Sequence, residues 1–224
     1  MRSGDARREI LHAIRTNLRS SPPVQSSPSP EGRGGQGVRT PAGRGGQAVR
    51  ITQFTEQLTA VGARCTTVRG EADAAAALAR ILTEAGARRV VGSDAPLVQR
   101  LLQSVGNGLV LATDRLERLS RDELFACDAG VTTAQWGIAE TGTLVLESAR
   151  ERSRLLSLVP PIHVALLSTR CICDSLGDAL ARVSTSSHAI TFITGPSRTS
   201  DIELTLVVGV HGPQTVHVLL MEES

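Results

Sequence analysis

One segment of the sequence combines residue types that can hold an anion. Residues 190–210 read ITFITGPSRTSDIELTLVVGV, which predicts a strand, a sharp turn at Gly195-Pro196 and an apolar helix beginning at Ile202. The first amides of a helix and the positive end of its dipole favour an anion. Arg198 adds a planar fork that matches a carboxylate or a phosphate. The turn therefore predicts a small anion-binding site whose candidate residues are Gly195, Ser197, Arg198, Thr199 and Asp201.

The same segment also fits a purely structural role. Ser200 or Asp201 can cap the predicted helix by accepting a hydrogen bond from a free backbone N–H group. Arg198 can reach a nearby carboxylate instead of a ligand. The strand before the turn would be buried through Ile190, Phe192 and Ile193. Sequence alone leaves both interpretations open.

A second motif lies upstream, at Glu140-Thr141-Gly142-Thr143, directly before an apolar strand at 143–146. The glycine allows the backbone to approach a ligand or to adopt a conformation closed to other residues. Glu140 can act as a general base, as a nucleophile or only as a cap. We therefore add Glu140 as a tentative catalytic residue, and Thr141, Gly142 and Thr143 as candidate ligand-binding residues.

Two histidines lie downstream of the Glu140–Thr143 motif. His211 lies in a turn, His211-Gly212-Pro213, after the predicted helix, from which its side chain could reach the strand ends near Arg198. It is therefore a candidate ligand-binding residue. His163 opens an apolar strand and fits a hydrogen-bonded structural role better than a catalytic one.

No metal or cofactor site is predicted within this chain. The four cysteines, Cys65, Cys127, Cys171 and Cys173, form neither a C-x-x-C pair nor a ferredoxin-type run. Cys171 and Cys173 could share one face of a strand, but no histidine lies at ligand spacing, so we interpret them as buried thiols. Because the sequence has no lysine and no tyrosine, lysine Schiff-base chemistry and tyrosine acid/base catalysis are excluded.

The sequence divides into an arm and one domain. Residues 1–19 predict an amphipathic N-terminal helix, since apolar residues recur along 10–18. Residues 20–50 are rich in Ser, Pro, Gly and Arg and repeat GRGGQGVR as GRGGQAVR, which predicts a flexible linker. Residues 51–224 form the predicted domain. No run is apolar enough for a membrane span and no secretory signal is recognised, so a cytoplasmic location is expected.

Strands and helices alternate through the predicted domain. This order is typical of an α/β fold with a mostly parallel sheet covered on both faces. Ligands bind such sheets at the carboxyl ends of the strands, where residues 195–201 are expected to fall. The predicted helices are 51–62, 73–86, 96–104, 114–126 and 175–183, and the predicted strands are 65–68, 88–92, 109–112, 128–133, 143–146, 163–168, 190–193 and 215–221.

Three phrases together resemble a known family: GIAETGTLVLES, LLSLVPPIHVALL and ITGPSRTSDIELTLVVGVHGP. They are similar to the LUD-domain family of lactate-utilisation proteins, in its C-subunit (LutC/YkgG-like) branch. The resemblance is strong over residues 125–224 and general over 51–124, and the linker departs from the usual family length. It implies a three-layer α/β/α sandwich like the NagB/RpiA/CoA-transferase group. It also implies a role in oxidising L-lactate to pyruvate with separate partner subunits that carry the iron–sulphur clusters.

Three functional hypotheses follow. The first is an accessory subunit that binds a small carboxylate or phosphate-bearing ligand. The second is an enzyme of CoA-transferase or isomerase-like chemistry that uses Glu140. The third is an RNA-associated protein acting through the Arg-Gly-Gly arm, where residues 1–50 carry 9 arginines against 3 acids. That arm lacks interleaved aromatic residues, so a solvated linker is favoured over a nucleic-acid partner.

Overall fold

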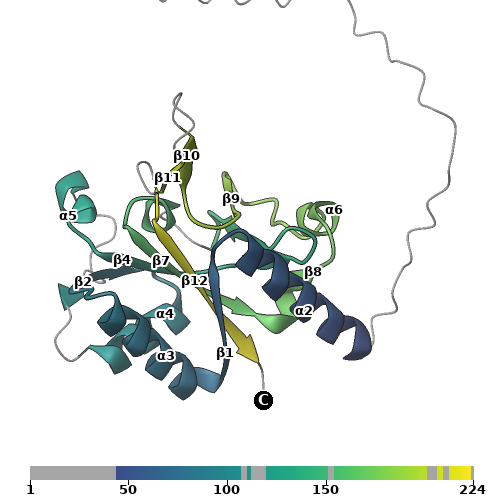
Figure 1. Ribbon diagram of the computed structural model, residues 1–224, viewed down its shortest axis with the longest axis horizontal. Helices are drawn as coiled ribbons and strands as arrows, with labels where there is room; N and C mark the ends of the chain where they lie inside the picture. The colour runs from purple at the N-terminus through teal and green to yellow at the C-terminus, as the bar shows by residue number, and fades with distance from the viewer. Residues whose placement is uncertain are drawn as a thin grey trace, which may run out of the picture. The chain divides into compact units, whose positions relative to one another are not determined.

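A six-stranded parallel sheet is the centre of the fold (Figure 1). The computed structural model describes residues 44–106, 110–111, 120–150, 154–200, 206–208 and 212–222. Every neighbouring pair of strands in this sheet is parallel, which confirms the predicted α/β fold with a mostly parallel sheet. In spatial order the strands are β1 (Arg64–Arg69), β12 (Thr215–Glu222), β7 (Ile162–Ser168), β4 (Ala129–Thr133), β2 (Arg89–Gly92) and β3 (Val110–Leu111).

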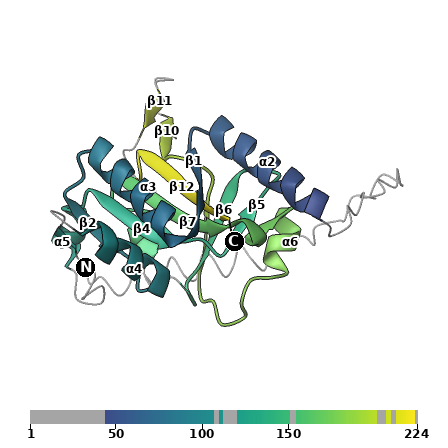
Figure 2. The ribbon, with the colours of Figure 1, turned by 90° about the horizontal axis from the view of Figure 1, so that it is seen from below.

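Two helices cover one face of this sheet. They are α3 (Gly70–Glu84) and α4 (Pro96–Val105), which lie side by side over the strands in Figure 2. In α3 the buried residues Ala74, Leu78, Ile81 and Leu82 recur at helical spacing, so one stripe of the helix faces the sheet. This stripe packs against alternate strand residues such as Val164.

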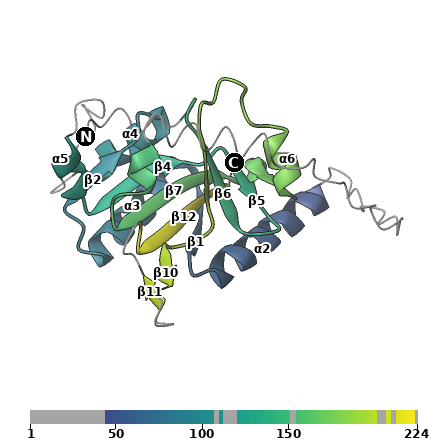
Figure 3. The same ribbon diagram turned by 90° about the horizontal axis from the view of Figure 1, so that it is seen from above.

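The opposite face is covered by a helix and a second, smaller sheet. The helix α2 (Arg44–Ala60) contributes Phe54 and Leu58, both fully buried, and lies next to β5 and β6 in Figure 3. The smaller sheet has the order β8 (Ile172–Cys173), β5 (Trp136–Ile138), β6 (Thr143–Glu147), β9 (Ile190–Ile193). The short helix α6 (Leu176–Leu180) packs on its outer side through Ala179. The second cover is thus helix plus sheet, where helices alone were expected.

The remaining short helical elements are α5 (Arg121–Phe125), η2 (Arg154–Ser157) and η3 (Thr169–Cys171). Two of them, α5 and η2, pack on the central sheet, where Leu124 and Leu156 form a buried cluster with Val91. Within the described part of the chain, no helix combines the length and the apolar character needed to cross a membrane.

The predicted linker extends too far toward the domain. Helix α2 begins at Arg44, inside the second Gly-Arg repeat, whereas residues 20–50 were expected to be flexible. Tertiary contacts explain the difference, because the Gln47 amide donates to the Thr169 carbonyl and Arg50 pairs with Asp174 at 2.9 Å. The predicted helix in residues 1–19 and the rest of the linker lie outside the described residues.

The helix predicted from Ile202 is wrong. Arg198–Ser200 (β10) and Leu206–Val208 (β11) form an antiparallel pair instead, at the top of Figure 1. Apolar residues alternate with others through IELTLVV at 202–208, which is a strand period. The predicted burial of the preceding strand is also incorrect in part. In β9, Ile190 and Phe192 are 36% and 43% exposed and only Ile193 is buried, because β9 is an edge strand.

Candidate functional site

The Glu140–Thr143 motif forms a tight turn against helix α2. Gly142 has φ of +64°, and a Cβ built on it would lie 2.3 Å from the backbone nitrogen of Leu58. Glycine is therefore required by the close approach of two backbones. The Thr143 hydroxyl lies 2.7 Å from the hydroxyls of both Thr141 and Thr194. Glu140 is exposed, and its backbone N–H donates to the Asp174 carbonyl at 3.1 Å.

The Gly195–Arg198 segment contacts the same helix. A Cβ on Gly195, which has φ of +87°, would lie 2.8 Å from the Val61 carbonyl oxygen. The Arg198 guanidinium donates to this oxygen at 2.7 Å. Val61 follows the last residue of α2, where carbonyl groups lack helical partners and the helix dipole is negative. Arg198 therefore binds a helix C-terminus, whereas a helix N-terminus had been predicted beside it.

The location of this segment also differs from the prediction. The Ser197 N–H donates to the Pro213 carbonyl at 2.8 Å, and Pro213 lies two residues before the first residue of β12. The segment thus lies at the amino end of a parallel strand, not at the carboxyl ends. The two motifs do lie close together, since both contact the last turn of α2. Thr199 lies in β10, and Asp201 and His211 fall outside the described residues, so ligand binding by these residues stays a prediction.

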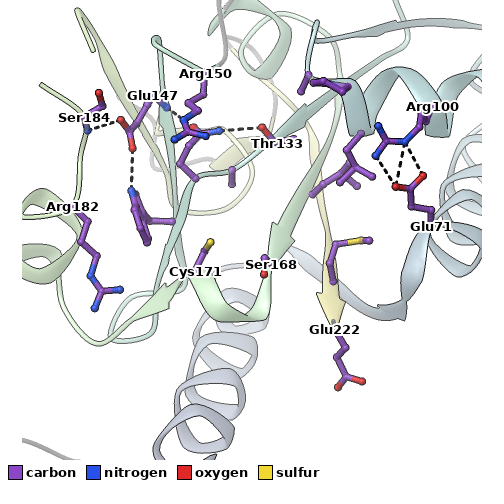
Figure 4. Close-up of a pocket in the computed structure, with 18 of the residues that line it drawn as sticks. Glu71, Arg100, Thr133, Glu147, Arg150, Ser168, Cys171, Arg182, Ser184 and Glu222 are labelled. Carbon is purple, nitrogen blue, oxygen red and sulfur yellow. Dashed lines mark hydrogen bonds and ion pairs between the residues drawn. The ribbon is translucent and has the colours of Figure 1, made fainter. Parts of the chain in front are cut away.

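The carboxyl ends of the parallel strands frame a cavity of about 750 Å³. Residues that end or directly follow β1, β4, β7 and β12 line it, as do the first residues of α3 and α4 (Figure 4). This is the edge at which open parallel sheets bind ligands. The volume lies within the range of ordinary small-molecule sites, roughly 300–1,000 Å³. We therefore take this carboxyl-edge cavity as the candidate site.

Three arginines line the carboxyl-edge cavity, in different states of pairing. Arg100 is held by Glu71 through contacts of 2.6 and 2.9 Å, and this hydrogen bonding lowers the pKa of the Glu71 carboxyl. Arg182 lies over the ring of Trp136, 5.4 Å from its centroid. Among the described residues, no carboxylate lies within ion-pair distance of Arg182 or Arg150. Either guanidinium group can therefore bind an anion without breaking an ion pair to a carboxylate in the described part of the chain.

A buried carboxylate fixes the wall beside these arginines. Glu147 is 3% exposed and accepts the Trp136 indole N–H at 3.0 Å. Its other oxygen accepts from the Ser184 N–H at 2.7 Å and the Ser187 hydroxyl at 2.9 Å. The Glu147 N–H in turn donates to the Gln135 side chain at 2.6 Å. A buried charge with this many donors is well satisfied, so the indole is held in one orientation.

His163 has the structural role predicted for it. Its Nε2 lies 2.9 Å from the Thr132 hydroxyl, and the side chain is fully buried. Burial lowers the pKa of His163 to about 4, so the ring is neutral at pH 7. Among the described cysteines, Cys173 is buried and Cys171 lines the cavity. No group of three or more His, Cys, Asp or Glu in the described ranges could hold a metal.

The residues of the carboxyl-edge cavity were not identified from the sequence. Trp136, Glu147, Arg150 and Arg182 come from separate segments, and no local motif joins them. One signal was available, because Trp136 is the only tryptophan in a sequence with 2% aromatic residues and it follows a predicted strand end. The polar side chains after strands 64–69 and 129–133 gave a second signal.

Comparison with known proteins assigns the family. The model of the LUD domain matches residues 51–221. The chain belongs to the LUD-domain family. This LUD-domain protein is 35% identical to YkgG of Escherichia coli strain K12 over 166 residues, which cover 68% of this chain and 71% of YkgG. These matches confirm the resemblance recognised in the three sequence phrases.

Two further matches bear on function and fold. Lactate utilization protein C of Exiguobacterium is 33% identical over 111 residues, covering 46% of this chain and 48% of that protein. This LUD-domain protein spans about half the length of most of the curated relatives it matches. A crystal structure of a DUF162 family protein from Deinococcus radiodurans superposes with a TM-score of 0.60 at 26% identity. The match covers 78% of this chain and 98% of that one.

Proposed function

We propose that this LUD-domain protein takes part in lactate utilisation as an accessory subunit and binds a small organic anion in its carboxyl-edge cavity. Support for the process comes from relatives that carry the name lactate utilization protein C. In this proposal, separate iron–sulphur subunits accept the electrons released when L-lactate becomes pyruvate. The LUD-domain protein contributes binding and positioning.

One observation carries the binding part of the proposal. Arg150 and Arg182 both line the carboxyl-edge cavity, and neither pairs with a carboxylate among the described residues. Guanidinium groups match carboxylate and phosphate in shape and charge. The first turns of α3 and α4 also open onto this cavity, and their dipoles add a favourable potential for an anion.

Calorimetric titration with L-lactate, pyruvate and inorganic phosphate tests the binding. Arg150→Gln should weaken binding of the preferred anion by about 1.5–3 kcal/mol, the usual contribution of a hydrogen bond to a charged group. Arg80→Gln is the matched control, because it removes the same charge from an exposed site on α3 outside the cavity. The proposal fails if none of the three anions binds, or if Arg150→Gln behaves like Arg80→Gln.

The accessory role has a separate test. The purified chain alone should not oxidise L-lactate with an artificial electron acceptor, whereas a host strain lacking it should lose growth on L-lactate. Restoring the natural sequence should restore growth, and restoring Arg150→Gln should restore it poorly. Undiminished growth of the deletion strain on L-lactate would exclude this role.

A further inference from the structure

The carboxyl-edge cavity is larger than a three-carbon acid requires. At about 750 Å³ it matches sites that enclose drug-sized ligands. Much of its remaining wall is apolar, from Ala95, Pro96, Leu97, Leu166 and Met221. A three-carbon acid held by Arg150 or Arg182 would leave that wall uncovered. Uncovered apolar surface in a site favours a ligand with an apolar body.

The two sides of the cavity differ in charge. Figure 4 shows Arg182 and Glu147 on one side and Arg100 with Glu71 on the opposite side. Since Arg100 and Glu71 neutralise one another, the side that they form offers little net charge to an anion. Among the described residues, Arg150 and Arg182 have no carboxylate partner. The carboxylate on their side, Glu147, already accepts hydrogen bonds from Trp136, Ser184 and Ser187. The anionic group of a ligand is thus favoured on the side of Arg150 and Arg182. The rest of the ligand is then expected to lie toward the apolar wall.

Trp136 adds a flat surface beside the anionic position. The sequence contains one tryptophan, three phenylalanines and no tyrosine, yet the tryptophan lines the cavity and is half-buried. Its N–H is already bonded to Glu147 and Arg182 lies over one ring face, so its remaining contribution to a ligand is the other ring face. Aromatic rings and guanidinium planes stack on planar ligand groups.

We propose that the preferred ligand of the carboxyl-edge cavity is an organic anion that carries a planar ring. Its anionic group contacts Arg150 and Arg182, and its ring lies against Trp136 and the apolar wall. This inference rests on the proposed function, because it takes the same cavity as the anion site. Two sources share this chemistry, a ring-bearing carboxylate and a nucleoside monophosphate.

Two matched ligand pairs test the inference. The first pair is L-lactate and phenyllactate, and the second is inorganic phosphate and AMP. Because the chain has one tryptophan and no tyrosine, fluorescence excited at the red edge of the tryptophan band reports on the cavity wall. In one of the two pairs, the ring-bearing ligand should bind at least about tenfold more tightly than its counterpart without a ring, because it buries more apolar area. It should also change the fluorescence emission of Trp136. The pair that responds identifies the anionic group.

Two variants locate the ring and the anion. Leu97→Gln places a polar group in the apolar wall. In the responding pair, it should reduce the ratio between the affinity of the ring-bearing ligand and that of its counterpart without a ring. Arg150→Gln should weaken both members of the pair, whereas Arg80→Gln should weaken neither. Far-ultraviolet circular dichroism checks that each variant is folded.

The outcomes separate this inference from the proposed function. Equal affinities within both pairs, with binding that still depends on Arg150, would overturn the ring-bearing ligand and leave the anion site intact. A ring-bearing ligand unaffected by both Leu97→Gln and Arg150→Gln would bind elsewhere, which also overturns it. If no member of either pair binds, the anion site of the proposed function fails as well.

Discussion

Replacing Gly142 by alanine tests whether the Glu140–Thr143 turn is needed for packing. The residue has φ of +64°, which costs a non-glycine residue roughly 1–2 kcal/mol. The added Cβ would also lie 2.3 Å from the Leu58 nitrogen and 2.6 Å from the Gln57 carbonyl carbon. Both atoms are backbone, so α2 or the turn must shift, and overpacking of this kind costs about 1–3 kcal/mol. We expect Gly142→Ala to lower the free energy of unfolding by roughly 2–5 kcal/mol in total.

Gly86→Ala is the matched control for this prediction. Gly86 has nearly the same φ, +65°, but a Cβ there would meet nothing within 4 Å. Gly86→Ala should therefore lower the free energy of unfolding only through the unfavourable positive φ, by roughly 1–2 kcal/mol. Urea unfolding followed by circular dichroism and by Trp136 fluorescence measures both variants, and the melting temperature should fall about 2–4 °C per kcal/mol. Equal losses for the two variants would refute the packing argument.

Two other predictions concern His163 and Arg198. Because the pKa of His163 falls from 6.5 to about 4 on folding, the unfolded chain binds its proton first as the pH falls. Stability should therefore drop by about 3 kcal/mol between pH 6.5 and 4. Urea unfolding at several pH values should show this loss of stability for the natural chain and not for His163→Gln. If the two proteins lose stability equally as the pH falls, the role of His163 is refuted. Arg198→Ala removes the bond to the Val61 carbonyl and should cost about 0.5–1.5 kcal/mol of stability without changing anion affinity in calorimetry. A loss of anion affinity would instead support the site first predicted at that turn.

The long apolar segments were predictable from the sequence. Residues 163–168 and 215–221 were predicted as strands because apolar residues dominate them over a full strand length, and both lie buried in the sheet. The segment after Gly195-Pro196 was not predicted correctly, because a polar run before apolar residues resembles the start of a helix. The alternation in IELTLVV competes with that signal, and pairing between Arg198 and Val208 decides the outcome. Strands β5 and β8 are too short to show a period.

The candidate site depends on strand order, which periodicity does not contain. The rule that ligands bind at carboxyl ends was applied to residues 190–193, but that strand belongs to the smaller sheet. The carboxyl ends that meet are those of β1, β12, β7, β4 and β2, from distant parts of the chain. Trp136 meets Arg182, and Glu71 meets Arg100, only after this order is set. Local motifs therefore identified the turns that brace α2 and missed the cavity.

The position of β1 has a consequence for synthesis on the ribosome. This strand has a single neighbour in its sheet, β12, and Arg64 pairs with His217, about 150 positions later. At roughly 5–20 residues per second, about 8–30 seconds pass between translation of the two. During that time Val68, which ends almost fully buried, has no strand to pair with. Such distant pairing slows folding, so the newly made chain should depend on chaperones that shield apolar strands until the last one emerges.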